Sequence, residues 1–368
     1  MRKSRFVVSL ALVTLVASAC SSAASPTPPP LPATGTPASA TSGATVTPAS
    51  ASAEVTYAIP PSSFTMTMIV KIAGLDWYSQ MESGLKVVGA ATGLNVSQTG
   101  PTQATAEAQV TIIQGLIPTK PTVIGINPNN EDALEGVLKN AQDAGIKIIG
   151  TEGPDLTNAN LDLEAMDNKA YGAEMMDSLA TCMGGQGTYA AFVGHLTAAS
   201  HMQWVASALQ QAQAKYPGIT RVSDPIESQE DGNIAYQKTK ELLQKYPDLK
   251  GIEGSGATDV QGAARAVEEA GLGGKICIVG TSLPSLVTQY VKDGTIYRIF
   301  CWDPKLSGEA LAEGAIFLAE GGTPYTGMNL HVPGYENLQP CGAPFAASCF
   351  EGNGPLSIGK ENIDQYKF

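Results

Sequence analysis

The feature that most limits the fold is a regular alternation, from about residue 63 onward, of short apolar runs with longer stretches of helical periodicity. The apolar runs fall at 67–72, 94–96, 123–126 and 146–149, and the helical stretches between them at 79–92, 105–116 and 131–144. Strands separated by helices of this length have to run parallel, because each connection crosses back over the sheet. Helices then cover both faces. The pattern predicts an α/β fold built on a parallel sheet.

The same alternation of apolar runs and helical stretches resumes after residue 167, which predicts a second α/β lobe. Helices are expected at 169–183, 201–215, 233–245, 260–270 and 283–292, and strands at 189–193, 219–223, 251–253, 276–279 and 296–301. A further helix over 305–320 could belong to either lobe, and a short helix near 361–366 closes the chain. Ligands of such sheets bind where the loops at the carboxyl ends of the strands converge. Two facing lobes therefore predict a ligand site in the cleft between them.

The first residues predict export and anchoring. Arg2, Lys3 and Arg5 precede an apolar run over 6–17 that is too short to span a bilayer, the pattern of a signal peptide over 1–19. The small residues directly before Cys20 resemble the lipobox of bacterial lipoproteins, in which that cysteine is lipidated and becomes the new N-terminus. We therefore expect Cys20 to be a lipid anchor. The alternative is an ordinary secretory signal with a chance cysteine.

A low-complexity segment follows the anchor. Residues 21–53 are almost entirely Ser, Ala, Thr, Pro and Gly, a composition that cannot bury enough apolar surface to order a chain. We expect a lipidated cysteine and a disordered linker over 20–60, which hold a domain over 61–368 near the membrane surface. No later run is long and apolar enough to cross a bilayer.

Charge and motifs argue against several classes of function. The net charge is −12, with 22 Lys and Arg against 34 Asp and Glu, whereas nucleic-acid binding needs clustered cations. The Gly-x-Ser-x-Gly turn of hydrolases is absent, and His195, His201 and His331 lack further ligands at zinc spacing. The glycine-rich stretches 184–187 and 271–274 follow helices, as C-caps do, whereas phosphate loops open helices. We expect no metal, no cofactor and no enzymatic activity.

Five cysteines remain besides Cys20, and the odd number leaves at least one free thiol unless chains cross-link. Cys341 and Cys349 bracket a short loop rich in Gly, Pro and Ala and are predicted to form a disulfide. Cys277 and Cys301 lie in apolar strand-like runs, which favours burial as small hydrophobic side chains over pairing. The sequence leaves the states of Cys182, Cys277 and Cys301 open.

The loop after the first strand carries residue types that suit a sugar. Lys71 lies in the apolar run, and Asp76, Trp77 and Tyr78 follow it. Aromatic rings stack on the C–H faces of sugars, while Asp, Asn and Lys bond the hydroxyls. One of the two rings could instead be a hydrophobic staple at the start of a helix. The loop indicates a small polar ligand with a ring.

From residue 65 to 368 the chain resembles the type I periplasmic sugar-binding proteins, the substrate receptors of ATP-driven importers. The markers are Asp76-Trp77-Tyr78, Ile126-Asn127-Pro128, Glu152, Asp167-Asn168 and Ile278-Val279-Gly280. Further stretches are similar to the branch that binds the furanosyl autoinducer signal and rhamnose-like sugars, namely Val70-Lys71-Ile72, Gln203-Trp204-Val205, Cys301-Trp302-Asp303 and the ending 360–368. The order and spacing of these markers carry the resemblance.

The resemblance implies two Rossmann-like lobes with parallel sheets and a ligand sandwiched between them. The first lobe would comprise about 63–165 plus 304–325, and the second about 168–302 plus the C-terminal segment. Three crossings would join them, near 166–167, 280–281 and 302–303. Ligand contacts made by both lobes exist only in the closed form, so binding would shift the protein toward closure.

The resemblance also implies the ligand-binding residues. The first lobe would contribute Lys71, Asp76, Trp77, Tyr78, Asn127 and Glu152, with Lys71 on ligand oxygens and the two aromatic residues flanking the ring. In the second lobe Ser200 and His201 stand where autoinducer receptors have an acid and an amide, Ser255 where they have a proline, and Ala257 matches. Asp259, Ser282 and Asp303 are further polar candidates there. Because of the departures, we expect the furanosyl signal to bind weakly.

These implications predict a monomeric, extracytoplasmic solute-binding lipoprotein that captures a small sugar and delivers it to the permease subunits of an ABC importer. Three alternatives stay open. The chain could be a receptor for a furanosyl autoinducer, or a nucleoside-binding lipoprotein, since aromatic rings also stack on bases. The third is an enzyme on a similar scaffold.

Overall fold

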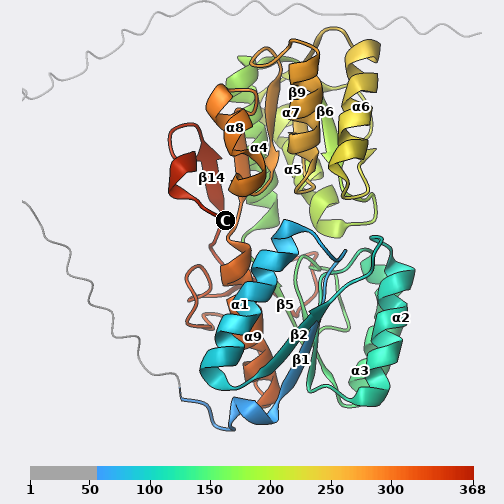
Figure 1. The fold of residues 1–368 in the computed structure, drawn as a ribbon, viewed down its shortest axis with the longest axis vertical. Helices are drawn as coiled ribbons and strands as arrows, with labels where there is room; N and C mark the ends of the chain where they lie inside the picture. The colour runs from blue at the N-terminus through green and yellow to red at the C-terminus, as the bar shows by residue number, and fades with distance from the viewer. Residues whose placement is uncertain (1–55) are drawn as a thin grey trace, which may run out of the picture. The chain divides into compact units, whose positions relative to one another are not determined.

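Two mostly parallel sheets, each covered by helices, organise residues 56–368, the part of the chain that the computed structural model describes (Figure 1). This arrangement confirms the expected pair of parallel-sheet α/β lobes. The predicted signal peptide, Cys20 and most of the predicted linker lie outside the described residues. Within the described part, none of the helices has the length and apolar character needed to cross a membrane.

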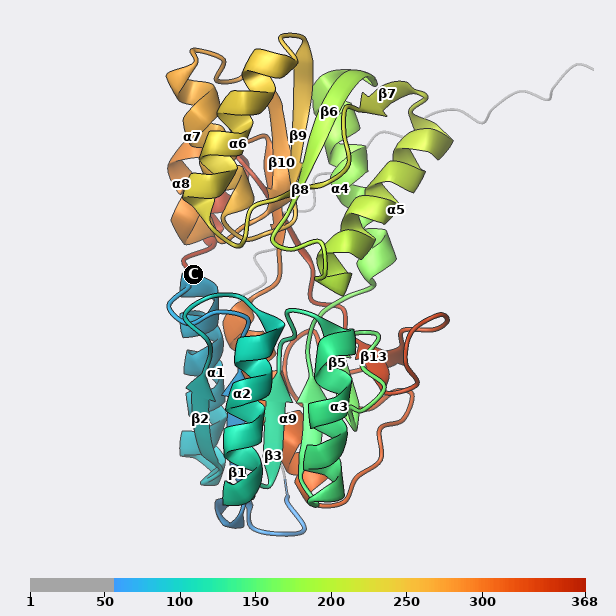
Figure 2. The ribbon, with the colours of Figure 1, turned by 90° about the vertical axis from the view of Figure 1, so that its right-hand side faces the viewer.

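The first lobe has a seven-stranded sheet. Its order is β12 (Gln339–Pro340), β13 (Cys349–Glu351), β5 (Leu161–Glu164), β4 (Lys147–Gly150), β3 (Val123–Ile126), β1 (Thr65–Ile69) and β2 (Asn95–Thr99). All neighbours pair in parallel except β12 and β13. α1 (Asp76–Thr92) and α9 (Pro304–Ala319) cover one face, and α2 (Ala106–Leu116) and α3 (Glu131–Asp143) the other (Figure 2). Strands β1, β3 and β4 therefore have apolar side chains on both faces.

The second lobe repeats this plan. Its sheet runs β14 (Leu356–Gly359), β11 (Arg298–Cys301), β10 (Cys277–Thr281), β9 (Leu249–Gly254), β6 (Gln186–Val193) and β7 (Gly218–Arg221), with β8 (Ile226–Glu227) paired to β6. The helices are α4 (Asn168–Met183), α5 (Ala199–Lys215), α6 (Gly232–Lys245), α7 (Asp259–Glu269) and α8 (Pro284–Asp293). Only β14 runs antiparallel, on the edge beside β11. The helices α4 and α5 lie on one face and α6 and α7 on the other (Figure 2).

Two glycines place α9 in the first lobe, where the periodicity alone allowed either lobe and the family resemblance implied the first. A Cβ at Gly84 on α1 would collide with the backbone carbonyl of Lys305, and a Cβ at Gly308 on α9 would collide with that of Met81. The absence of both side chains lets the two helices pack backbone to backbone. The helix therefore belongs to the first lobe, as expected for 304–325.

Two of the three predicted crossings are confirmed and one is wrong. The chain passes between lobes at 165–167, from β5 to α4, and at 302–303, from β11 to α9. Gly280 and Thr281 instead end β10 inside the second sheet, and the chain continues to α8 of the same lobe. The third crossing is 352–355, between β13 and β14.

The C-terminal segment is divided between the lobes rather than assigned wholly to the second. Strands β12 and β13 extend the first sheet, and β13 pairs with β5, a strand that the sequence pattern did not reveal. Only β14 and the closing turn join the second lobe. That turn is a short 3-10 helix, Ile363–Gln365, within the range predicted for a closing helix.

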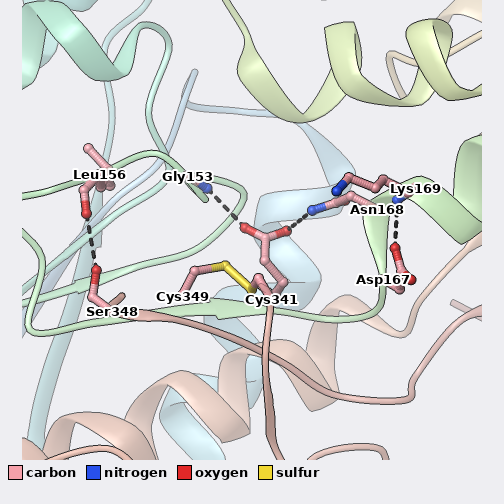
Figure 3. The surroundings of a disulfide bond; sticks show 9 residues. Gly153, Leu156, Asp167, Asn168, Lys169, Cys341, Ser348 and Cys349 are labelled. Carbon is pink, nitrogen blue, oxygen red and sulfur yellow. Dashed lines mark hydrogen bonds between the residues drawn. A yellow bond between two sulfur atoms is a disulfide. The ribbon is translucent and has the colours of Figure 1, made fainter. Parts of the chain in front are cut away.

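The cysteines of residues 56–368 form two disulfides. Cys341 and Cys349 are disulfide-bonded, as the sequence predicts, and Cys301 is buried and has no disulfide partner among the described residues. Cys277 does not follow the interpretation that the sequence favours, because this residue is bonded to Cys182, 95 positions away, where the end of α4 meets the start of β10. Figure 3 shows the Cys341–Cys349 bridge beside the loop at Gly153 and the start of α4. The bridge thus braces the edge of the first sheet close to a crossing.

Candidate functional site

A pocket between the lobes collects the ends of strands from both sheets. We call it the interlobe pocket; it is lined by Lys71, Leu75, Trp77, Tyr78 and Glu152 from the first lobe, by His201, Trp204, Glu230, Ser255, Ala257 and Thr281 from the second, and by Trp302 at a crossing. Its walls leave about 20 Å³ of free space between them, room for about one water molecule. A ligand with a ring therefore requires the walls to move apart.

The first lobe places a buried ion pair in this pocket. Lys71 Nζ lies 2.7 Å from Glu152 Oε2, and the two residues are 1% and 7% exposed. Asn127 donates from Nδ2 to the other Glu152 oxygen at 3.0 Å. Burial acts to lower the pKa of Lys71, but the charges of Glu152 and Glu230 outweigh it and raise the pKa above its ordinary value. Lys71 is therefore a charged donor.

Three tryptophans form the apolar walls. The rings of Trp77 and Trp302 meet edge to face with centroids 4.7 Å apart. Trp204, from the second lobe, packs edge to face against Trp302 with centroids 6.0 Å apart and is fixed by a 2.6 Å hydrogen bond from its Nε1 to Asn168. Such rings offer flat surfaces of large area and keep their orientation, because they pack against one another.

The second lobe contributes a neutral imidazole. His201 Nδ1 accepts a hydrogen bond from the backbone N–H of Gly194 at 3.1 Å, which leaves the ring proton on Nε2. Burial, followed by the nearby positive charge of Lys71, holds the pKa of His201 well below its ordinary 6.5. The histidine is therefore an uncharged hydrogen-bonding group at neutral pH.

Two polar atoms of the pocket have no hydrogen-bond partner within the described chain. They are Nε1 of Trp77 and Oγ of Ser255, both shielded from solvent. A buried donor without a partner costs about 1–3 kcal/mol. A ligand that carries hydroxyl oxygens would satisfy both atoms, one from each lobe.

The structure brings together seven of the thirteen predicted binding residues in the pocket lining, namely Lys71, Trp77, Tyr78, Glu152, His201, Ser255 and Ala257. Asn127 stands behind them and supports Glu152. Asp76 is the first residue of α1 and borders a neighbouring hollow with Trp77 and Ala257.

Of the other four predicted residues, three make local hydrogen bonds, and the side chain of the fourth makes none within the described chain. Asp303 caps α9 by accepting from the backbone N–H groups of Lys305 and Leu306. Asp259 accepts from the Gly256 N–H, and Ser282 donates to the Ala257 carbonyl. Ser200 is buried on α5, and its Oγ has no partner in the described chain.

Sequence reasoning missed five lining residues, which are Leu75, Trp204, Glu230, Thr281 and Trp302. Trp204 and Trp302 belong to stretches that carried the family resemblance, so a signal for them was present. Glu230 had none, because it lies in an irregular turn whose place depends on the tertiary fold.

Comparison with known proteins agrees with this architecture. Residues 66–323 match the family model of the periplasmic binding protein domain. The chain belongs to this family. The match confirms the family expected from the sequence. It is a family of extracytoplasmic solute-binding proteins, which agrees with the expectation that the chain is not an enzyme.

Solved structures of periplasmic binding proteins share the fold. LsrB from Clostridium saccharobutylicum in complex with AI-2 aligns with a TM-score of 0.77 at 20% identity, over 83% of this chain and 100% of that one. An ABC transporter solute-binding protein from Clostridium phytofermentas with bound L-rhamnose gives 0.77 at 23%, over 82% and 98%. One from Burkholderia graminis in complex with D-arabinose gives 0.71 at 23%, over 83% and 98%.

Proposed function

We propose that this periplasmic binding protein captures one small sugar in the interlobe pocket and delivers it to an ABC importer. The observation that carries the proposal is the pair of unpartnered buried donors, Trp77 Nε1 and Ser255 Oγ, one on each lobe. A ligand has to bond both lobes at once to satisfy them. Such a ligand stabilises the closed form, the shape that an importer can recognise.

The remaining lining supports a polyhydroxylated ring. Aromatic walls stack on C–H faces, while the Lys71–Glu152 pair offers a charged donor and acceptor to hydroxyl groups. Related structures were solved with L-rhamnose and D-arabinose, a deoxyhexose and a pentose. A pentose, a deoxyhexose or a related sugar is the ligand class that this lining fits.

The lobes also meet directly at the rim of the cleft. Thr197 on the second lobe donates from Oγ to the backbone carbonyl of Asn129 on the first, at 2.9 Å. Asn129 in turn donates from its side chain to the carbonyl of Lys71. Asn129 thus links Thr197, across the cleft, to the backbone of Lys71 in the pocket. These two hydrogen bonds couple closure of the lobes to the binding site.

A thermal-shift screen tests the ligand class. Its members are L-rhamnose, D-arabinose, D-fucose, the furanosyl autoinducer AI-2, and adenosine and uridine. A ligand that binds only the folded state raises its stability by about 2.7 kcal/mol at a hundred times the dissociation constant. We expect a raised melting temperature with at least one of the three sugars. A shift with the autoinducer or a nucleoside alone would contradict the sugar assignment.

We further propose that Cys20 anchors the protein to the membrane as a lipoprotein. The support is the charged start, the short apolar run and the small residues before this cysteine. Cys20→Ser should release the protein into the soluble fraction without changing sugar affinity, whereas Ser25→Ala should leave it membrane-bound. Retention of the Cys20→Ser protein in the membrane fraction would refute the anchor.

A further inference from the structure

Glu230 lines the interlobe pocket but is not among the ligand-binding residues predicted from the sequence. It follows β8 and precedes α6, in a turn of the second lobe, and is 7% exposed. Its backbone and that of Gln229 both have φ of 58°, the left-handed region that non-glycine residues avoid. Glu152, the carboxylate supplied by the first lobe, has φ of 54°. Strain of this kind gathers at ligand-binding sites.

Hydrogen bonds hold the strained turn in place. The backbone N–H of Ser228 donates to Val193 and that of Gln229 to Gly194, at 2.9 and 2.8 Å. Val193 is the last residue of β6 and Gly194 directly follows it, so the turn is fixed to the end of this strand. These bonds fix the backbone just before Glu230 relative to the second sheet. The position of Glu230 is therefore set by the fold of the lobe.

Gly194 makes room for this carboxylate. A Cβ at Gly194 would collide with the side-chain carboxylate of Glu230. Gly194 is not among the glycines with positive φ, so its backbone does not itself require glycine. The missing side chain accommodates Glu230. The carboxylate lies 3.8 Å from Nδ1 of His201.

The pocket consequently contains two carboxylates and one ammonium group. Glu152 and Glu230 come from opposite lobes, and both charges raise the pKa of Lys71. His201 adds no charge at neutral pH, because its pKa is lowered by burial and by Lys71. Burial raises the pKa of Glu230, and Lys71 opposes that rise. With both carboxylates ionised, one negative charge is left over.

Resting on the proposed sugar-binding function, we propose that Glu230 restricts the ligand to uncharged sugars and excludes sugar acids. Without it, Lys71 and Glu152 would form a balanced pair that leaves the site neutral. With it, an anionic ligand meets an excess of like charge in a buried space, where charge repulsion is screened little. Repulsion of this kind is an effective means of rejecting a competing ligand.

Three matched ligand pairs test the inference by calorimetry at pH 8, which favours ionised carboxylates. They are L-rhamnose and L-mannuronate, D-fucose and D-galacturonate, and D-arabinose and L-galacturonate, each pair with the same ring configuration. In the wild type the neutral member should bind tighter than its acid. In Glu230→Gln the ratio of the two dissociation constants should shift toward the acid by about tenfold or more.

Two further variants separate charge selection from a structural role. Gly194→Ala should displace the Glu230 carboxylate without deleting it and shift the ratio in the same direction. Glu227→Gln removes a nearby charge outside the pocket lining and should leave the ratio unchanged.

Two results would count against the inference. If a neutral sugar binds but the ratio is equal in the wild type and Glu230→Gln, the inference fails and the proposed function stands. If none of the three neutral sugars binds, both fail.

Discussion

Lys71 Nζ and Glu152 Oε2 lie 2.7 Å apart with almost no exposure to solvent, so each charge depends on the other. Removing one partner of a buried pair leaves an uncompensated charge and costs about 3–5 kcal/mol, whereas replacing both by apolar residues is often neutral. Lys71→Met should therefore lower the free energy of unfolding by about that amount. The double variant Lys71→Met/Glu152→Leu should recover most of it.

Urea unfolding of both variants measures this, and sugar binding should be lost in both. Equal destabilisation of the single and double variants would show that the pair acts through packing rather than charge.

The two disulfides should differ in their contribution to stability, because one closes a far longer loop. Cys182 and Cys277 are 95 positions apart, while Cys341 and Cys349 are 8 apart. Loop-closure entropy predicts a loss of about 5 kcal/mol on replacing the first pair by serine and about 2.5 kcal/mol for the second. Denaturant unfolding under oxidising conditions measures both. A larger loss from the shorter loop would contradict the entropic account.

Glu131, the first residue of α3, should make the protein less stable as pH rises. Burial, followed by the charges of Asp155 and Glu164, raises its pKa to about 9, against an ordinary 4.5. Between these values the folded state keeps a proton that the unfolded state releases. Its stabilising contribution is therefore fully present below pH 4.5 and is lost as pH rises to about 9, at up to about 1.4 kcal/mol per pH unit.

Glu131→Gln should remove this dependence. Its stability relative to the wild type should increase between pH 5 and pH 9 in urea unfolding. Asp132→Asn, at the exposed neighbouring position, is the matched control and should follow the wild type. Parallel pH profiles for Glu131→Gln and the wild type would refute the raised pKa.

Much of the fold could be predicted, because regular elements carry their own periodicity. The alternation from residue 63 to 302 gave the two lobes and nearly all their helices. Strand β5 escaped because two of its four residues are acidic, Asp162 and Glu164, although all four are buried. The Cys182–Cys277 bridge escaped because only the tertiary fold brings its two ends together.

The pocket lining was predictable where its residues closely follow strands or open helices, as Lys71, Trp77 and His201 do. It was not predictable where a polar residue has a local alternative. Asp303 was predicted to bind ligand, and the structure shows it as the N-cap of α9, a role that aspartate before a helix commonly takes. Glu230 was missed for the opposite reason, because no local sequence pattern predicts the turn in which it lies.

Titration calorimetry of L-rhamnose, D-arabinose and D-fucose into wild type, Trp77→Phe and Trp77→Ala tests the central claim most directly. We expect at least one sugar to bind the wild type at micromolar concentration or below, about −8 kcal/mol. Trp77→Phe keeps an aromatic ring but removes the unpartnered Nε1 donor, and should cost about 1 kcal/mol. Trp77→Ala also removes the stacking surface and should cost about 1–3 kcal/mol. Binding of none of these sugars, or sugar binding indifferent to both variants, would contradict a sugar site between the lobes.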